Sequence, residues 1–222
     1  MSNLNRARLA LLILFVAIAY LMRFNTIVGI ESDILLDLHS HSTDSIDHTM
    51  LAVNAIGGPK PVLVAALLLA FIVFRKGDKR EAVIIPFAVG ISGALNVGMR
   101  ALFHWPRPDL WRTLIYDHSF VYSFPGGHAC LSASLATVVN MVLWRTRYRR
   151  LAVIGGIVYC LVVATTTLFL GVHYPMDILA GWISGFLVVS ILWSGGEAIS
   201  ARFGNRDTSR RLNQVQADEQ GS

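Results

Sequence analysis

The chain has few charged side chains and very few cysteines for its length. Of its 222 residues, 15% are charged and two are cysteines, whereas 54% are hydrophobic. Cys130 and Cys160 both fall inside apolar runs at different depths, so we expect neither a disulfide nor a metal site there and interpret both as small core residues. The apolar content exceeds that of an ordinary soluble domain, which indicates an integral membrane protein.

The sequence also lacks an internal repeat, a low-complexity tract and a soluble domain of useful size. We therefore predict one transmembrane domain over residues 1–200. From Arg202 onward the chain holds charges, Gln, Asn and Ser with almost no apolar content. Such a composition cannot bury a core, so residues 201–222 are predicted to be a disordered cytoplasmic tail.

Six apolar runs are candidates to cross a hydrocarbon core of roughly 30 Å. They extend over Leu9–Leu21, Ala55–Phe74, Ala82–Phe103, Ala129–Trp144, Leu151–Val172 and Ile178–Trp193. These runs predict an all-α fold, a polytopic bundle of six transmembrane helices. The first run, preceded by Arg6 and Arg8, also fits a cleavable signal peptide, and cleavage would leave the later orientation unchanged.

The basic residues indicate the orientation, because Lys and Arg concentrate in cytoplasmic loops. They flank the first, second, fourth and sixth runs, whereas the opposite loops carry mostly acidic residues. Both termini are therefore predicted to be cytoplasmic. No nucleic-acid partner is expected, because the Arg-rich run at 145–150 abuts apolar helices and no binding module surrounds it.

Residues 25–50 form a long external connection, interpreted as a segment along the membrane interface. Its His39, His41 and His48 lie near two aspartates and could imitate a metal cluster, but their spacing matches no closed zinc pattern. We interpret them as residues of a solvated loop and expect no metal and no cofactor.

A candidate nucleophile lies between the last two apolar runs. His173 precedes Asp177 by four residues, about one helical turn, so the carboxylate can hold one imidazole nitrogen and leave the other free to attack. Taken alone, an interfacial His with Asp capping the following helix explains the pair equally well.

Two further motifs are predicted to lie on the same side of the membrane as His173. In Pro125-Gly-Gly-His128, Gly126 and Gly127 precede a helix whose N-terminus can bind an anion, and His128 can protonate a leaving oxygen. An ordinary turn is the simpler interpretation of the glycines alone. Arg100 and Arg107 supply positive charge for phosphate oxygens, although each could also be an ordinary interfacial cation.

The order and spacing of these motifs resemble the type-2 phosphatidic acid phosphatase (PAP2) superfamily. Residues that match its pattern are Arg107, Pro108, Pro125, Gly127, His128, His173 and Asp177, and the likeness covers roughly helices two to six. The resemblance implies a six-helix bundle, a covalent phosphohistidine at His173, protonation of the leaving group by His128, and no metal.

Three positions depart from the family pattern. Arg100 stands in place of Lys, Gly126 in place of Ser, and Thr166-Thr167 in place of Ser-Arg. Losing the Arg at Thr167 is the largest change, because a charge-assisted donor to a transferring phosphoryl group is worth on the order of 3 kcal/mol. Hydroxyls such as that of Thr167, or a cation from Lys60 or Arg112, can compensate, and we favour Arg112.

These features predict a phosphatase of a bacterial-type inner membrane whose active site faces the periplasm or exterior. The family implies a lipid phosphate or diphosphate as substrate: an isoprenoid diphosphate such as undecaprenyl diphosphate, phosphatidic acid, phosphatidylglycerol phosphate or the phosphates of lipid A. A non-catalytic lipid-phosphate binder and a lipid phosphotransferase are the alternatives. The sequence leaves the oligomeric state open.

Overall fold

A computed structural model describes the backbone of residues 3–24, 27–111 and 122–220, and side chains as far as Glu197. Within these ranges the chain is helical, apart from one isolated bridge between Pro106 and Tyr122. The elements are α1 (Asn3–Arg23), α2 (Val28–Ser40), α3 (Asp44–Asn54), the short 3₁₀ helix η1 (Ala55–Gly57), α4 (Pro59–Arg75), α5 (Lys79–Phe103), α6 (Gly127–Leu143), α7 (Arg149–Phe169) and α8 (Pro175–Gln220).

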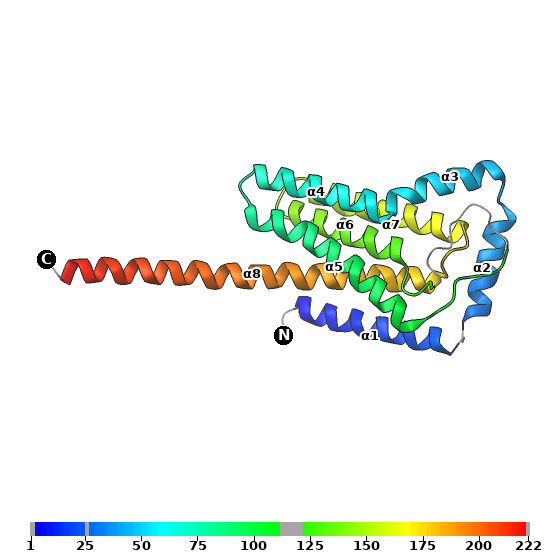
Figure 1. Cartoon of the computed structure of the whole chain (residues 1–222), viewed down its shortest axis with the longest axis horizontal. Coiled ribbons are helices and arrows are strands. Elements are labelled where there is room, and N and C mark those ends of the chain that lie inside the picture. Colours follow the sequence, from blue (N-terminus) through cyan, green and yellow to red (C-terminus); the bar gives the residue numbers. More distant parts are fainter. Residues whose placement is uncertain (1–2, 25–26, 112–121, 221–222) are drawn as a thin grey trace.

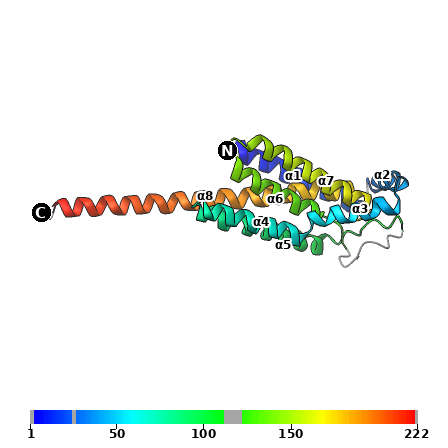
Figure 2. The same ribbon diagram turned by 90° about the horizontal axis from the view of Figure 1, so that it is seen from above.

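The bundle is formed by α4 to α7 and the first half of α8, with α1 packed beside α8 (Figure 1). Helix α6 contacts both α7 and α8, so it lies at the centre of the arrangement. Helix α2 lies across one end of the bundle, and the second half of α8 projects beyond the other end (Figures 1 and 2). The turns that carry the three sequence motifs all lie at the α2 end.

The expectation of an all-α membrane protein is confirmed. Each of the six apolar runs is helical over most of its length, and four helices in the described ranges are long and apolar enough to cross a membrane. A fifth span is possible if α3–η1 and α4, which meet at a 42° bend, are counted as one. Helix α6 is shorter, at 17 residues, so the six-span count and the cytoplasmic termini stay predictions.

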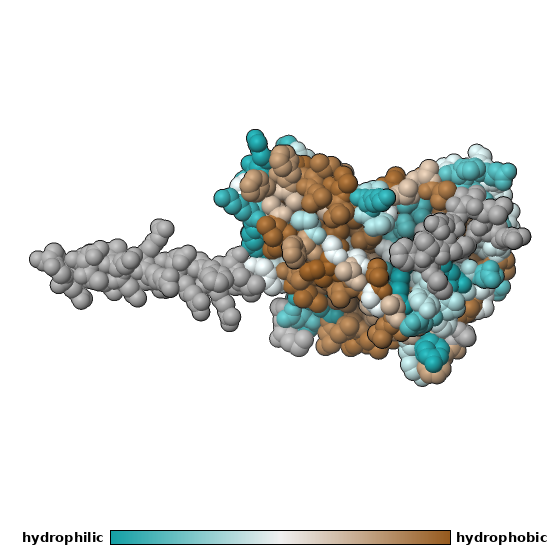
Figure 3. All heavy atoms as spheres, in the orientation of Figure 1, coloured by the Kyte–Doolittle hydropathy of each residue, from teal (hydrophilic) through white to brown (hydrophobic). Residues whose placement is uncertain are grey.

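The surface of the bundle agrees with a lipid environment. Apolar side chains cover its middle, with polar side chains toward both ends (Figure 3). Large side chains such as Phe71, Phe87 and Ile157 are more than half exposed. Exposed apolar area on this scale is unfavourable in water but not in a hydrocarbon phase.

The segment 25–50 is helical over most of its described length, so its histidines do not lie in an extended loop as expected, and its position along the membrane interface stays a prediction. Helix α2 forms because Glu31 and Leu35 share one buried face. Helix α3 begins at a cap in which the Thr43 side chain accepts a hydrogen bond from the Ile46 amide at 3.3 Å. Among the described residues there is no group of three or more His, Cys, Asp or Glu arranged to hold a metal ion.

The polar C-terminal segment continues α8. The sequence predicts a disordered tail over residues 201–222, whereas the backbone is helical to Gln220. With no proline and a single glycine between residues 201 and 220, nothing in this segment forces the helix to end. The division of the chain near residue 200 stays a prediction.

Close packing of α6 on α8 positions the site. A Cβ on Gly181 of α8 would collide with the Gly126 carbonyl oxygen at the start of α6. Only glycine allows the two backbones to approach this closely. The start of α6 is thereby held against the start of α8, and the second motif against the third.

Candidate active site

Three hydrogen bonds to backbone carbonyls link the sequence motifs to one another. The Gly126 amide donates to the Asp177 carbonyl at 2.8 Å. Arg100 Nε donates to the Pro125 carbonyl at 3.0 Å, and Arg107 Nη1 donates to the Val172 carbonyl at 2.9 Å. The end of α5, the start of α6 and the α7–α8 turn therefore form one interlocked unit at one end of the bundle.

His173 lies in the α7–α8 turn and is 1% exposed. Its Nδ1 lies 3.5 Å from Asp177 Oδ2, slightly longer than an ordinary hydrogen bond. Burial lowers the pKa of His173 well below its usual range, and the positive charges of Arg100 and Arg107 act in the same direction. The imidazole is therefore neutral at neutral pH, which is the form that can act as a nucleophile.

Asp177 is fully buried in the first turn of α8. Its Oδ2 accepts a hydrogen bond from the Tyr174 amide at 2.8 Å, so the carboxylate also caps the helix. The two interpretations that the sequence left open for Asp177 are thus not exclusive. The His173 ring is buried within the protein, and its role as nucleophile stays a prediction.

His128 is the second residue of α6 and belongs to the same cluster. Its charge state acts on the pKa of His173, together with Arg100 and Arg107. These four side chains therefore share one electrostatic environment. The turn before α4 lies beside them, since a Cβ on Gly58 would lie 3.7 Å from His128 Nε2.

The two glycines of the second motif differ in their surroundings. A Cβ on Gly127 would lie 2.5 Å from Arg100 Nη2, so the missing side chain allows the guanidinium to lie against the start of α6. The amide of Gly126 is already bonded to the Asp177 carbonyl. Phosphate binding by Gly126 stays a prediction, and the amide of Gly127 lies at the helix N-terminus, where an anion is favoured.

Thr167 is 1% exposed, and its hydroxyl donates to the Ala164 carbonyl of its own helix at 2.8 Å. The neighbouring Thr166 donates to Asn54 Oδ1 at 3.0 Å, which connects α7 to α3. Arg112, the predicted substitute cation, lies outside the described residues. Lys60 is exposed near the start of α4, two residues after Gly58.

Sequence reasoning missed several residues that hold the site together. Asn96, one turn before Arg100, donates to the same Pro125 carbonyl at 3.2 Å. Ser123 joins the second motif to the loop after α5, because its Oγ donates to the Pro106 carbonyl at 3.0 Å. A polar Asn four residues before Arg100 in an apolar run was the available signal for the first. Ser123 begins the second motif, which extends to His128, but no role was predicted for it.

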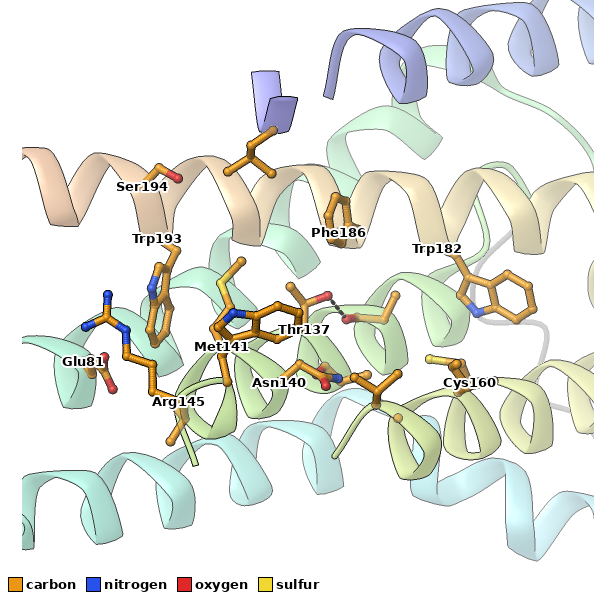
Figure 4. A pocket seen from close by; sticks show the side chains of 18 of the residues that line it. Glu81, Thr137, Asn140, Met141, Arg145, Cys160, Trp182, Phe186, Trp193 and Ser194 are labelled. Carbon is orange, nitrogen blue, oxygen red and sulfur yellow. Dashed lines mark hydrogen bonds between the residues drawn. The ribbon is translucent and has the colours of Figure 1, made fainter. Parts of the chain in front are cut away.

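A separate cavity of about 980 Å³ lies deeper between α6, α7 and α8 (Figure 4). Its lining runs along α8 from Trp182 to Glu197 and is mainly apolar. Its lining residues include none of the motif residues Arg100, Arg107, His128, His173 and Asp177. The cavity is therefore distinct from the candidate active site.

A known protein family matches the part of the chain that forms this site. The family model described as the PAP2 superfamily matches residues 81–199, more than half of the chain. The chain belongs to the PAP2 superfamily. The matched range contains all three motifs, from Arg100 to Asp177, and so confirms the resemblance seen in the sequence.

Three curated proteins with phosphatase names are similar to this chain in sequence. Phosphatidylglycerophosphatase B of Bacillus subtilis is 22% identical over 159 residues, which cover 69% of this chain and 77% of the relative. Undecaprenyl-diphosphatase of Sulfolobus acidocaldarius is 29% identical over 138 residues, 60% of this chain and 63% of the relative. Phosphatidylglycerophosphatase B of Haemophilus influenzae is 31% identical over 88 residues, and the match spans only 36% of that protein.

Two crystal structures share the fold. A transmembrane PAP2-type phosphatidylglycerolphosphate phosphatase from Bacillus subtilis superposes with a TM-score of 0.74 at 19% identity, covering 86% of this chain and 96% of that one. LpxE from Aquifex aeolicus gives a TM-score of 0.56 at 20% identity, covering 73% and 93%. The chain therefore has the membrane PAP2 fold.

Proposed function

We propose that this protein is a membrane phosphatase that releases phosphate from a lipid phosphate or diphosphate. The observation that carries the proposal is the buried His173, 3.5 Å from the Asp177 carboxylate, in the electrostatic environment of His128, Arg100 and Arg107. A site that only bound phosphate would need the two cations but not a buried nucleophile with its orienting carboxylate. The phosphatase names of the relatives support the same reaction class.

Substrate binding in this proposal depends on positive charge. Arg100 and Arg107 hold the non-bridging phosphoryl oxygens, and the Gly127 amide at the start of α6 adds a neutral donor. Each arginine also bonds a backbone carbonyl of another motif. Phosphate binding and the joining of the motifs are thus performed by the same two side chains.

The chemistry proceeds in two displacements. The Nε2 lone pair of neutral His173 attacks phosphorus, an N–P bond forms, and the P–O bond to the lipid breaks while protonated His128 gives its proton to the leaving oxygen. Asp177 stabilises the positive charge that develops on His173. Neutral His128 then takes a proton from water, whose oxygen attacks phosphorus, and cleavage of the N–P bond returns His173.

This mechanism needs no metal ion, because two guanidinium groups and a helix N-terminus balance the charge of the phosphoryl group. The family cation at Thr167 is absent, and we propose that Arg112 replaces it. If phosphate release by an Arg112→Ala variant equals that of the unmodified protein, this assignment is wrong, and Lys60 becomes the next candidate.

We place the site at the periplasmic or external face of a bacterial-type inner membrane, with six spans and both termini in the cytoplasm. A site at that face suits an amphiphile whose tail remains in the outer leaflet. The candidate substrates are isoprenoid diphosphates such as undecaprenyl diphosphate, phosphatidic acid and phosphatidylglycerol phosphate, and we favour the isoprenoid carrier.

A lipid-phosphate binder without catalysis is the second candidate. It is favoured by Thr167, whose buried hydroxyl donates within α7 instead of supplying the family charge, and by Gly126 in place of Ser. The buried nucleophile, proton donor and carboxylate favour the enzyme.

A screen of phosphate release tests the proposal. Purified protein in detergent is given each candidate lipid phosphate, beside His173→Ala and the exposed-residue control His41→Ala. The enzyme predicts release by the unmodified protein and by His41→Ala, and none by His173→Ala. Lipid binding without release from any substrate would instead establish the binder.

A further inference from the structure

Helix α2 turns one of its faces toward the catalytic turn between α7 and α8. It lies across the end of the bundle that carries the three motifs (Figures 1 and 2). Glu31, Leu35 and His39 follow one another at intervals of four residues, so they form a single stripe along the helix. Each of the three contacts the turn or a residue packed on it.

Glu31 makes the most direct contact. Its side chain is 3% exposed, and Oε1 accepts a hydrogen bond from the Met176 amide at 2.8 Å. Met176 lies in the first turn of α8, where backbone amides have no partner within the helix. Glu31 therefore caps α8 from another helix, one residue before Asp177.

Leu35 and His39 extend the contact along the stripe. Leu35 is fully buried in a cluster that includes Tyr174 and Met176. The His39 ring stacks on Trp111, with centroids 4.0 Å apart and an angle of 6° between the planes. Trp111 in turn occupies the space where a Cβ on Gly171 would lie.

Gly171 has φ of +63°, a left-handed conformation that favours glycine and that begins the turn leading to His173. The opposite face of α2 has no comparable contacts with the turn, since Ile30 is 66% exposed and Asp33 is also exposed. The helix thus has one face that meets the catalytic turn and one that does not.

We propose that α2 positions the catalytic turn, and that Glu31 is a positioning residue that sets Asp177 against His173 by capping the start of α8. This inference rests on the proposed phosphatase activity. Glu31 acts through the Met176 amide and touches no reacting atom. The Asp177 carboxylate and the His173 ring depend on the path of residues 171–177, and small displacements of reacting groups are costly to catalysis.

The test compares two replacements of nearly equal size. Glu31→Gln keeps an oxygen that can accept from the Met176 amide, whereas Glu31→Leu fills the same space without an acceptor. We expect Glu31→Leu to lower kcat about tenfold with KM within about twofold, because the turn shifts while the phosphate-binding cations remain. Glu31→Gln should recover most of this loss, and Asp33→Ala, on the exposed face, should match the unmodified protein.

His39→Ala gives a second measurement through the stacked Trp111, with His41→Ala as its control, and we expect a smaller fall in kcat. Equal kcat for Glu31→Leu and the unmodified protein would overturn the proposal, as would equal losses in Glu31→Leu and Glu31→Gln. Thermal unfolding of each variant separates a displaced turn from a destabilised fold. Absence of activity in the unmodified protein would instead contradict the proposed function itself.

Discussion

Polar side chains are buried at one end of helices α6, α7 and α8 and exposed at the other end. At the motif-bearing end His173 and Asp177 are buried. At the other end Arg147 and Arg149 are exposed, with their guanidinium groups 4.7 Å and 5.6 Å from the ring centres of Tyr148 and Trp144. The same three helices thus carry buried polar groups at one end and solvated charges at the other.

We expect this difference to separate groups that take part in catalysis from groups that anchor the helices. Burying a polar group is unfavourable unless it finds partners, and the buried Asp177 carboxylate has one in the Tyr174 amide, which donates to its Oδ2. Exposed arginines require none, and we expect their positions to follow the preference of basic residues for one side of a membrane. Substitutions should therefore affect activity at one end and leave it unchanged at the other.

The largest effect is expected from the nucleophile. His173→Ala should lower phosphate release by at least about 10³-fold, because without the imidazole no covalent intermediate forms. Release of inorganic phosphate in detergent measures this, and a chelator should leave the unmodified activity unchanged. Activity that survives the substitution would rule out His173 as the nucleophile.

Arginines at the two ends provide a matched pair. Arg100→Ala should reduce kcat/KM by roughly 100-fold. The substitution removes the positive charge that binds the phosphoryl group and also the hydrogen bond to the Pro125 carbonyl. Arg147→Ala removes the same charge at the other end and should change kcat/KM by less than about twofold. Similar losses in both variants would contradict the division of the molecule into two functional ends.

Glycines at the two ends allow a finer comparison. Gly127→Ala places a Cβ 2.5 Å from Arg100 Nη2 and should displace the guanidinium, lowering kcat/KM roughly tenfold with little loss of stability. Gly156→Ala, whose Cβ would meet Asn140 and Ala136 at 3.1–3.2 Å, should leave kcat/KM nearly unchanged. Kinetics and thermal unfolding of the two variants test this expectation.

The smallest effect concerns pH. Because the positive charge of Arg107 contributes to the lowered pKa of His173, Arg107→Gln should raise that pKa. Protonated His173 cannot attack, so the acid limb of the kcat/KM profile should move to higher pH. A limb that moves to lower pH, or stays in place, would show that another group controls it.

The sequence predicted much of this molecule from local signals. The apolar runs are long enough to identify each helix of the bundle, and the motif spacing brought His128, His173 and Asp177 into one site. The sequence did not predict the helices α2 and α3 in segment 25–50, because this segment mixes acids, histidines and leucines and has no long apolar run. The buried stripe at Glu31, Leu35 and His39 is recognisable only once its partner is known.

The order of the apolar helices and the choice of candidate reacting side chains came from the sequence alone, because hydrophobic length and residue chemistry are local properties. The tertiary structure decided which groups are already engaged. It shows the Gly126 amide bonded to the Asp177 carbonyl, the Thr167 hydroxyl donating within α7, and Glu31 capping α8 from across the bundle. Those partners lie far apart in the chain, and only packing brings them together.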